Sequence, residues 1–127
     1  MRYEKLDAFH ACDTLTHAIY DLTEDWPSHE KYGLRSQVRR ASFSAAVNIV
    51  EGSSRPGAAE FARFLGISVS SLNEVEYCLR FAKRRGYLDD SSHDDAKRKL
   101  KDAGALTWKL YLSIVKAKRK PPKRRDD

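Results

Sequence analysis

The sequence predicts an all-α protein that folds as an antiparallel, up-down-up-down four-helix bundle. Apolar residues recur at spacings of three and four in four successive segments, the pattern of a helix with one face in a core. The breaks between these segments contain Gly, Pro or residues that cap helices. No alternating apolar and polar run bounded by an Asn-Gly or Asp-Gly turn indicates a strand.

The first two helices are expected near residues 5–23 and 33–51. Pro27 disfavours helix at the residue before it, so Trp26 is expected to fold back over the end of the core. Gly52 stands where a helix C-cap favours a residue that tolerates positive φ. The second helix has a core stripe and a further apolar stripe at Phe43, Val47 and Val50.

The last two helices are expected near residues 58–85 and 92–118. Gly86 is expected to end the third helix, and the residues from Asp89 to Ser92 are common N-caps that open the fourth. These helices complete a bundle domain over residues 1–118, followed by a basic, mobile C-terminal tail over residues 119–127.

The third helix has two apolar faces, which is more than the core of one bundle needs. Its first stripe is interrupted only by Ser68, and its second includes the polar residues Ser71 and Glu74. The second stripe is otherwise apolar, at Phe64, Ile67, Cys78 and Phe81. We therefore predict a homo-oligomer, in which the extra faces are buried between subunits.

The net charge of +6 is concentrated at the C-terminus. Residues 116–127 hold seven of the 24 Lys and Arg but only two of the 18 acids, which leaves residues 1–115 at +1. General attraction to phosphate must therefore come from the tail or from local basic clusters.

The residues that usually carry enzymatic chemistry do not converge in this sequence. The four histidines form no HExxH, Glu-x-x-His or His/Cys metal pattern, and there is no Gly-x-Ser-x-Gly motif. Cys12 and Cys78 are expected to be buried, reduced thiols. No signal peptide or membrane span is expected, so we predict a cytoplasmic protein that is not an enzyme and has no metal or cofactor.

Polar residues that interrupt the apolar stripes form the main candidate site. A buried Arg–Glu pairing between the second and third helices, with Asn48 bridging backbone groups, would satisfy them. The alternative is a ligand or nucleic-acid site made from the same groups. The residues of this predicted core or interface network are Arg35, Arg39, Asn48, Glu51 and Glu74.

Basic residues form a second candidate site, for contact with RNA or DNA. One cluster ends the third helix and another occupies the tail, although four nearby aspartates between residues 89 and 95 oppose the first. The candidate contacts are Arg84, Arg85, Lys118, Arg119, Lys120, Lys123, Arg124 and Arg125.

Short motifs over residues 3–115 together resemble a known family. They are Tyr3, Lys5-Leu6-Asp7, Lys31-Tyr32-Gly33-Leu34, Ser36-Gln37-Val38-Arg39-Arg40-Ala41, Asn48-Ile49, Glu51-Gly52, Glu60-Phe61, Phe64-Leu65, Ser71-Leu72-Asn73-Glu74, Glu76 and Gly86-Tyr87-Leu88. In combination they resemble the 23S rRNA-intervening-sequence proteins, which include accessory proteins of diversity-generating retroelements. One departure is Ala46, where members usually carry proline, so we expect a straighter second helix.

The resemblance implies a cytosolic four-helix bundle that assembles as a ring of five subunits. It implies no established enzymatic activity. Two functions stay open from the sequence: an assembly or adaptor protein that engages nucleic acid or a nucleic-acid-handling partner, and a protein-interaction scaffold with no nucleic-acid affinity.

Overall fold

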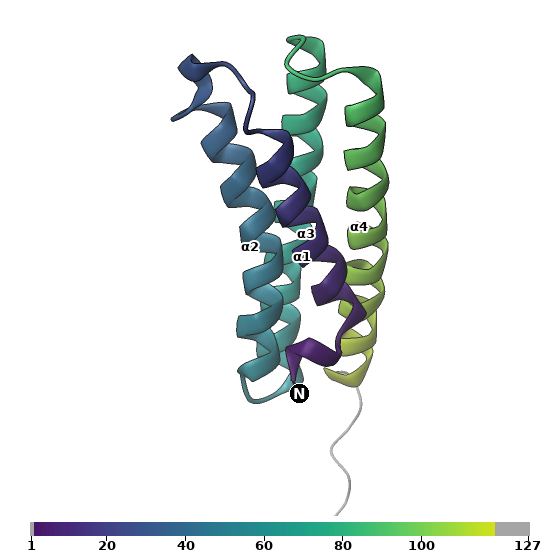
Figure 1. Ribbon diagram of the computed structural model, residues 1–127. Coiled ribbons are helices and arrows are strands. Elements are labelled where there is room, and N and C mark those ends of the chain that lie inside the picture. Colours follow the sequence, from purple (N-terminus) through teal and green to yellow (C-terminus); the bar gives the residue numbers. More distant parts are fainter. Residues whose placement is uncertain (1, 119–127) are drawn as a thin grey trace, which may run out of the picture.

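The structure, a computed structural model, describes residues 2–118 and contains four long helices in this range (Figure 1). The predicted tail at residues 119–127 lies outside the described residues. The four long helices are α1 (Asp7–Leu22), α2 (Leu34–Ser54), α3 (Ala58–Arg84) and α4 (Asp90–Lys118). Two short 3-10 helices, η1 (Tyr3–Lys5) and η2 (Ser28–Glu30), precede α1 and α2. The described part of the chain contains no strand.

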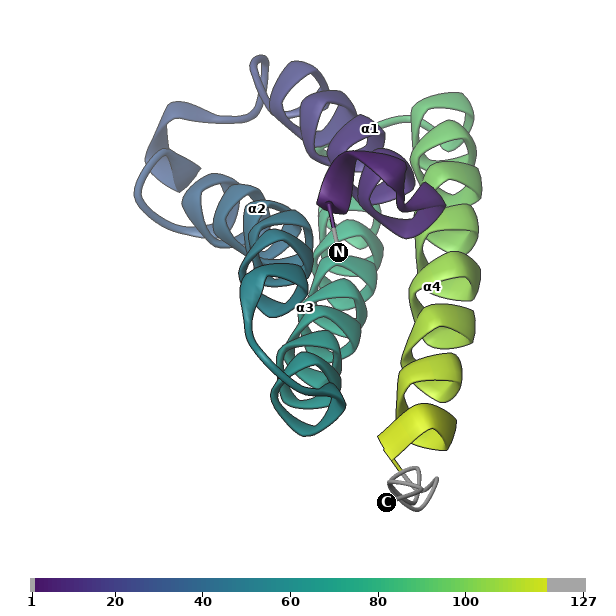
Figure 2. The ribbon, with the colours of Figure 1, turned by 90° about the horizontal axis from the view of Figure 1, so that it is seen from below.

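Consecutive helices run antiparallel and pack side by side (Figure 1). Seen along the bundle, α2 and α4 lie on opposite sides, with α1 and α3 between them (Figure 2). The predicted all-α four-helix bundle is therefore confirmed.

The core forms along the stripes that the sequence predicts. Each of the four helices contributes buried side chains, and those of Leu15, Ile49, Leu65 and Leu79 are almost completely buried. Burying a side chain of this size stabilises the fold by about 1.5–3 kcal/mol. Trp26 is also buried and closes one end of the core, as predicted.

Local signals explain how α3 and α4 end and begin. Gly86 has φ of 78°, and its N–H donates to the Lys83 carbonyl oxygen at 3.0 Å while the Tyr87 N–H donates to Ala82 at 2.9 Å. These two bonds form a Schellman motif, which confirms that Gly86 ends the helix. The Asp89 carboxylate caps α4 by accepting from the Ser92 N–H at 2.7 Å, and this bond lowers the Asp89 pKa.

Gly52 does not cap the second helix, so the sequence prediction was wrong at this residue. Helix α2 continues to Ser54, and positive φ occurs instead at Gly57, the residue before α3. A Cβ atom at Gly52 would lie 2.8 Å from Phe64 Cβ and 3.0 Å from a Phe61 ring carbon. Glycine is required here because α3 approaches α2 too closely for a side chain.

Buried hydroxyl groups join neighbouring helices inside the core. Ser68, the break in the α3 stripe, donates to the Ala45 carbonyl oxygen of α2 at 2.8 Å. Thr16 of α1 donates to the Ser42 carbonyl oxygen of α2 at 2.9 Å. Each hydroxyl is satisfied, which avoids the cost of about 1–3 kcal/mol for an unpaired buried polar group.

We predict that Gly52→Ala lowers the free energy of unfolding by about 1–3 kcal/mol, because the new methyl group overpacks the α2–α3 contact. Urea denaturation measures this change. Gly66→Ala is the matched control, since a Cβ atom at this residue would have no neighbouring atom within 4 Å, and alanine favours helix. Equal or greater stability of both variants would contradict close packing at Gly52.

Candidate functional site

Arg39 joins the end of α1 to the middle of α2. Its Nε donates to Thr23 Oγ1 at 2.8 Å, and its Nη2 donates to the Tyr20 carbonyl oxygen at 3.0 Å. The same Nη2 lies 3.1 Å from Glu24 Oε2, which also pairs with Arg35 at 3.5 Å. The guanidinium lies 4.6 Å from the centre of the Tyr20 ring. This cation therefore occupies the C-terminal end of α1, where the helix dipole favours positive charge.

Asn48 belongs to a separate polar group between α2 and α3. Its amide donates to the Ser44 carbonyl oxygen at 2.8 Å and to the Ser44 hydroxyl at 3.1 Å. The Ser44 hydroxyl lies 2.9 Å from that of Ser71 on α3. Further along the same pair of helices, the Gln37 amide donates to the Glu74 carboxylate.

The five residues of the predicted network do not join within the subunit. Arg35 and Arg39 pair with Glu24 rather than Glu74, so the expected Arg–Glu pairing between the second and third helices is not the one that forms. The reason is rotation, because the arginines face α1. Glu51 pairs instead with Arg55 on its own helix, at 3.8 Å. A role for these residues between subunits stays a prediction.

Sequence reasoning missed Glu24 and Gln37, the partners that hold these residues. Glu24 lies in the link after α1, where no periodic pattern indicates its neighbours. Gln37 stands one turn before Ala41 on α2, beside the core stripe, at a position typical of a helix-helix boundary. That position was the available signal for a contact with α3.

The candidate nucleic-acid contacts are only partly within the described residues. Arg84 and Arg85 are exposed at the end of α3, and Lys118 is exposed at the end of α4. Among the described residues, no acid lies within 4.0 Å of either arginine side chain's nitrogens, whereas Lys83 pairs with Asp90 at 3.5 Å. Arg119, Lys120, Lys123, Arg124 and Arg125 lie outside the described residues.

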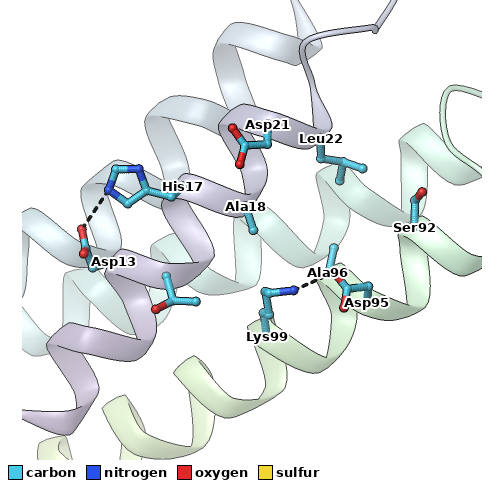
Figure 3. A pocket seen from close by; sticks show the side chains of 10 residues that line it. Asp13, His17, Ala18, Asp21, Leu22, Ser92, Asp95, Ala96 and Lys99 are labelled. Atoms are coloured by element: carbon cyan, nitrogen blue, oxygen red, sulfur yellow. Dashed lines mark hydrogen bonds and ion pairs between the residues drawn. The ribbon is translucent and has the colours of Figure 1, made fainter.

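A hollow between α1 and α4 contains the densest group of ionisable side chains (Figure 3). Lys99 Nζ lies 2.6 Å from Asp95 on α4, and His17 lies 3.5 Å from Asp13 on α1. Each pair is formed within one helix, as Figure 3 shows. The charges therefore do not converge across the hollow on a shared position, as general acid–base catalysis requires.

The two thiols are poor nucleophiles. Burial raises the pKa of Cys12, and burial together with the Glu74 charge raises the pKa of Cys78 to about 11. Both are free and buried, so the neutral thiol predominates. Within residues 2–118, no group of three or more His, Cys, Asp or Glu side chains could hold a metal ion. None of the helices in this range is apolar and long enough to span a membrane.

Large apolar side chains on the outside of the bundle are the more informative surface. The second stripes of α2 and α3 face solvent in the subunit, with Phe43 55% and Tyr77 65% exposed. On α4, Trp108 and Leu112 are each 49% exposed. Such groups mark interaction surfaces when they gather on one face.

Comparison with known proteins agrees with the fold and with the sequence motifs. The profile of the 23S rRNA-intervening sequence protein family matches residues 4–109. The chain belongs to this family. The resemblance drawn from the sequence motifs is thereby confirmed.

A solved structure from a related family has the same fold. It is a protein of unknown function from the S23 ribosomal protein family of Bacteroides thetaiotaomicron. The two chains are 18% identical, the match covers 83% of this chain and 95% of the other, and the TM-score is 0.74. At this identity the likeness supports the four-helix fold alone. No curated protein matches the sequence.

For this family member we predict that Arg39→Ala lowers the free energy of unfolding by about 1.5–3 kcal/mol, because it removes charge-assisted hydrogen bonds at the end of α1. Arg40→Ala is the matched control, since Arg40 is exposed and should change stability by less than about 0.5 kcal/mol. Thermal and urea unfolding compare the two variants. Equal effects would show that the Arg39 contacts contribute nothing to stability.

Proposed function

We propose that this protein is a non-enzymatic, cytoplasmic assembly protein that forms a homo-oligomer and engages nucleic acid or a nucleic-acid-handling partner. The observation that carries the proposal is the exposure of large apolar side chains on α2, α3 and α4. Burying these side chains between subunits gains about 25 cal/mol for each Å² of apolar surface. The number of subunits, five, comes from the family resemblance.

Basic segments support the nucleic-acid part of the proposal. Arg84 and Arg85 are exposed at the end of α3, and residues 119–127 add five Lys or Arg to the end of the chain. A ring would carry one copy of this segment on each subunit. Weak phosphate contacts by single segments then combine through their high effective concentration.

A protein-interaction scaffold with no nucleic-acid affinity is the second candidate function. Residues 1–115 carry a net charge of only +1, and aspartates stand close to Arg84 and Arg85 in the sequence. These charges oppose general attraction of the bundle itself to phosphate.

Titration of labelled RNA separates the two functions. We predict that the full chain binds poly(U) RNA and an RNA hairpin at about 50 mM salt, and that affinity falls steeply by about 200 mM. Removing residues 119–127 should abolish most binding, because each lost phosphate contact reduces the salt slope by roughly 0.7 on a single strand.

Light scattering of both proteins provides the control, because the truncated chain should keep the mass of the full-length assembly. That mass should be a multiple of the 14.5 kDa chain. Absence of binding by the full chain at low salt would favour the scaffold function, and a 14.5 kDa particle would contradict self-association.

A further inference from the structure

We propose that the subunits associate head to tail, with one edge of α4 from one subunit docked in the groove between α1 and α2 of the next. The α1–α2 groove is defined by Phe9, Tyr20, Phe43, Val47 and Val50, and the α4 edge by Trp108 and Leu112. This inference rests on the proposed self-association, and it adds the two surfaces that meet.

The α1–α2 groove is a hollow of about 370 Å³ whose walls are mainly apolar. Phe43 and Tyr20 stand at its sides with 55% and 41% of their surfaces exposed. Asp13 of α1 also borders it. An apolar groove that can receive a large side chain, with an acid at its margin, favours a partner that is both aromatic and basic.

The α4 edge has these properties. Trp108 and Leu112 lie one turn apart, and the Trp108 ring stacks on Tyr111 with 5.3 Å between ring centres. Aromatic residues fixed in this way often dominate the binding energy of an interface. Lys109 adjoins Trp108 in the sequence, and Lys116 follows Leu112 by one turn.

The charges of the two helices are complementary. Helix α1 contains three Asp and no Lys or Arg. Residues 103–118 of α4 contain three Lys and no Asp or Glu. A contact that paired either surface with its own copy would therefore bring like charges together, whereas the contact between the two surfaces brings opposite charges together.

The two surfaces also lie on different sides of the subunit. Leu106 borders the hollow between α4 and α1, whereas Gly104 borders the hollow between α4 and α3. Trp108 follows Gly104 by one turn, so the edge faces away from α1. Because α2 and α4 are on opposite sides of the bundle (Figure 2), both surfaces can be occupied at once. A repeated contact of this kind closes into a ring or extends as a filament.

The exposed face of α3 is the competing surface. It includes Ile67, Tyr77 and Phe81, but charges of both signs stand on the same helix face, at Arg63 and Glu74. This mixture favours no particular charge in a partner, in contrast to the α4 edge. Tyr77 is 65% exposed and therefore offers a matched control substitution.

Mixing of two variants tests the proposal. Phe43→Asp should disable the groove and Trp108→Asp the edge, so each variant alone should fall from the wild-type mass to 14.5 kDa. An equal mixture retains one intact groove and one intact edge, and should form a dimer of one chain of each variant. Sedimentation velocity and light scattering measure these masses, and circular dichroism with thermal unfolding establishes that each variant is folded. Tyr77→Asp should keep the wild-type mass.

Each other outcome contradicts a defined part of the account. A monomeric wild-type protein would overturn the proposed self-association itself. An oligomeric wild type whose two variants keep its mass would overturn only the assignment of surfaces. Two monomeric variants that fail to combine would overturn the head-to-tail contact. Loss of assembly in Tyr77→Asp, with Trp108→Asp unaffected, would place the edge on α3.

Discussion

Gly52 allows α2 to approach α3 until the rings of Phe61 and Phe64 lie against the α2 backbone. Further along the same pair of helices, Ser68 donates to the Ala45 carbonyl oxygen, and the hydroxyls of Ser44 and Ser71 meet. These contacts fix the rotation of both helices as well as their distance. Because a helix repeats every 3.6 residues, fixing one face determines which side chains point outward.

The outward side chains that result are unusual for an isolated bundle. Phe43 on α2 and Ile67 on α3 are exposed because the opposite faces of their helices occupy the core. At the same time, the polar groups inside the bundle are bonded to one another, and the ionisable groups at the hollow between α1 and α4 pair within their own helices. The capacity for interaction therefore lies in the outer faces of the helices rather than in a cavity.

Much of this fold could be predicted from the sequence because its information is local. The apolar spacing identifies the four helices, and Gly86 ends α3 by a motif that depends only on neighbouring residues. Gly52 was misassigned because a glycine that permits close packing and a glycine that permits positive φ are the same letter in a sequence. Only the position of Phe64 on another helix distinguishes them.

The polar site was less predictable for the same physical reason. Periodicity identified Arg39 and Glu74 as polar residues beside apolar stripes, but it contains no information on the relative rotation of two helices. Arg39 turns toward α1 and finds Glu24, while Glu74 finds Gln37. The exposed apolar stripe was predictable, since an apolar face beyond the core stripe can be seen in the spacing alone.

Chemical crosslinking between subunits tests the central claim, that the outer face of α2 and the edge of α4 meet in the assembly. A chain with both Phe43→Cys and Leu112→Cys would be treated with a short bismaleimide crosslinker. Cys12 and Cys78 are buried and have raised pKa values, so they should react slowly. The account predicts a ladder of covalent multimers under denaturing conditions, and none from either single variant. An assembly of wild-type mass without a ladder, or an equal ladder from Phe43→Cys alone, would contradict it.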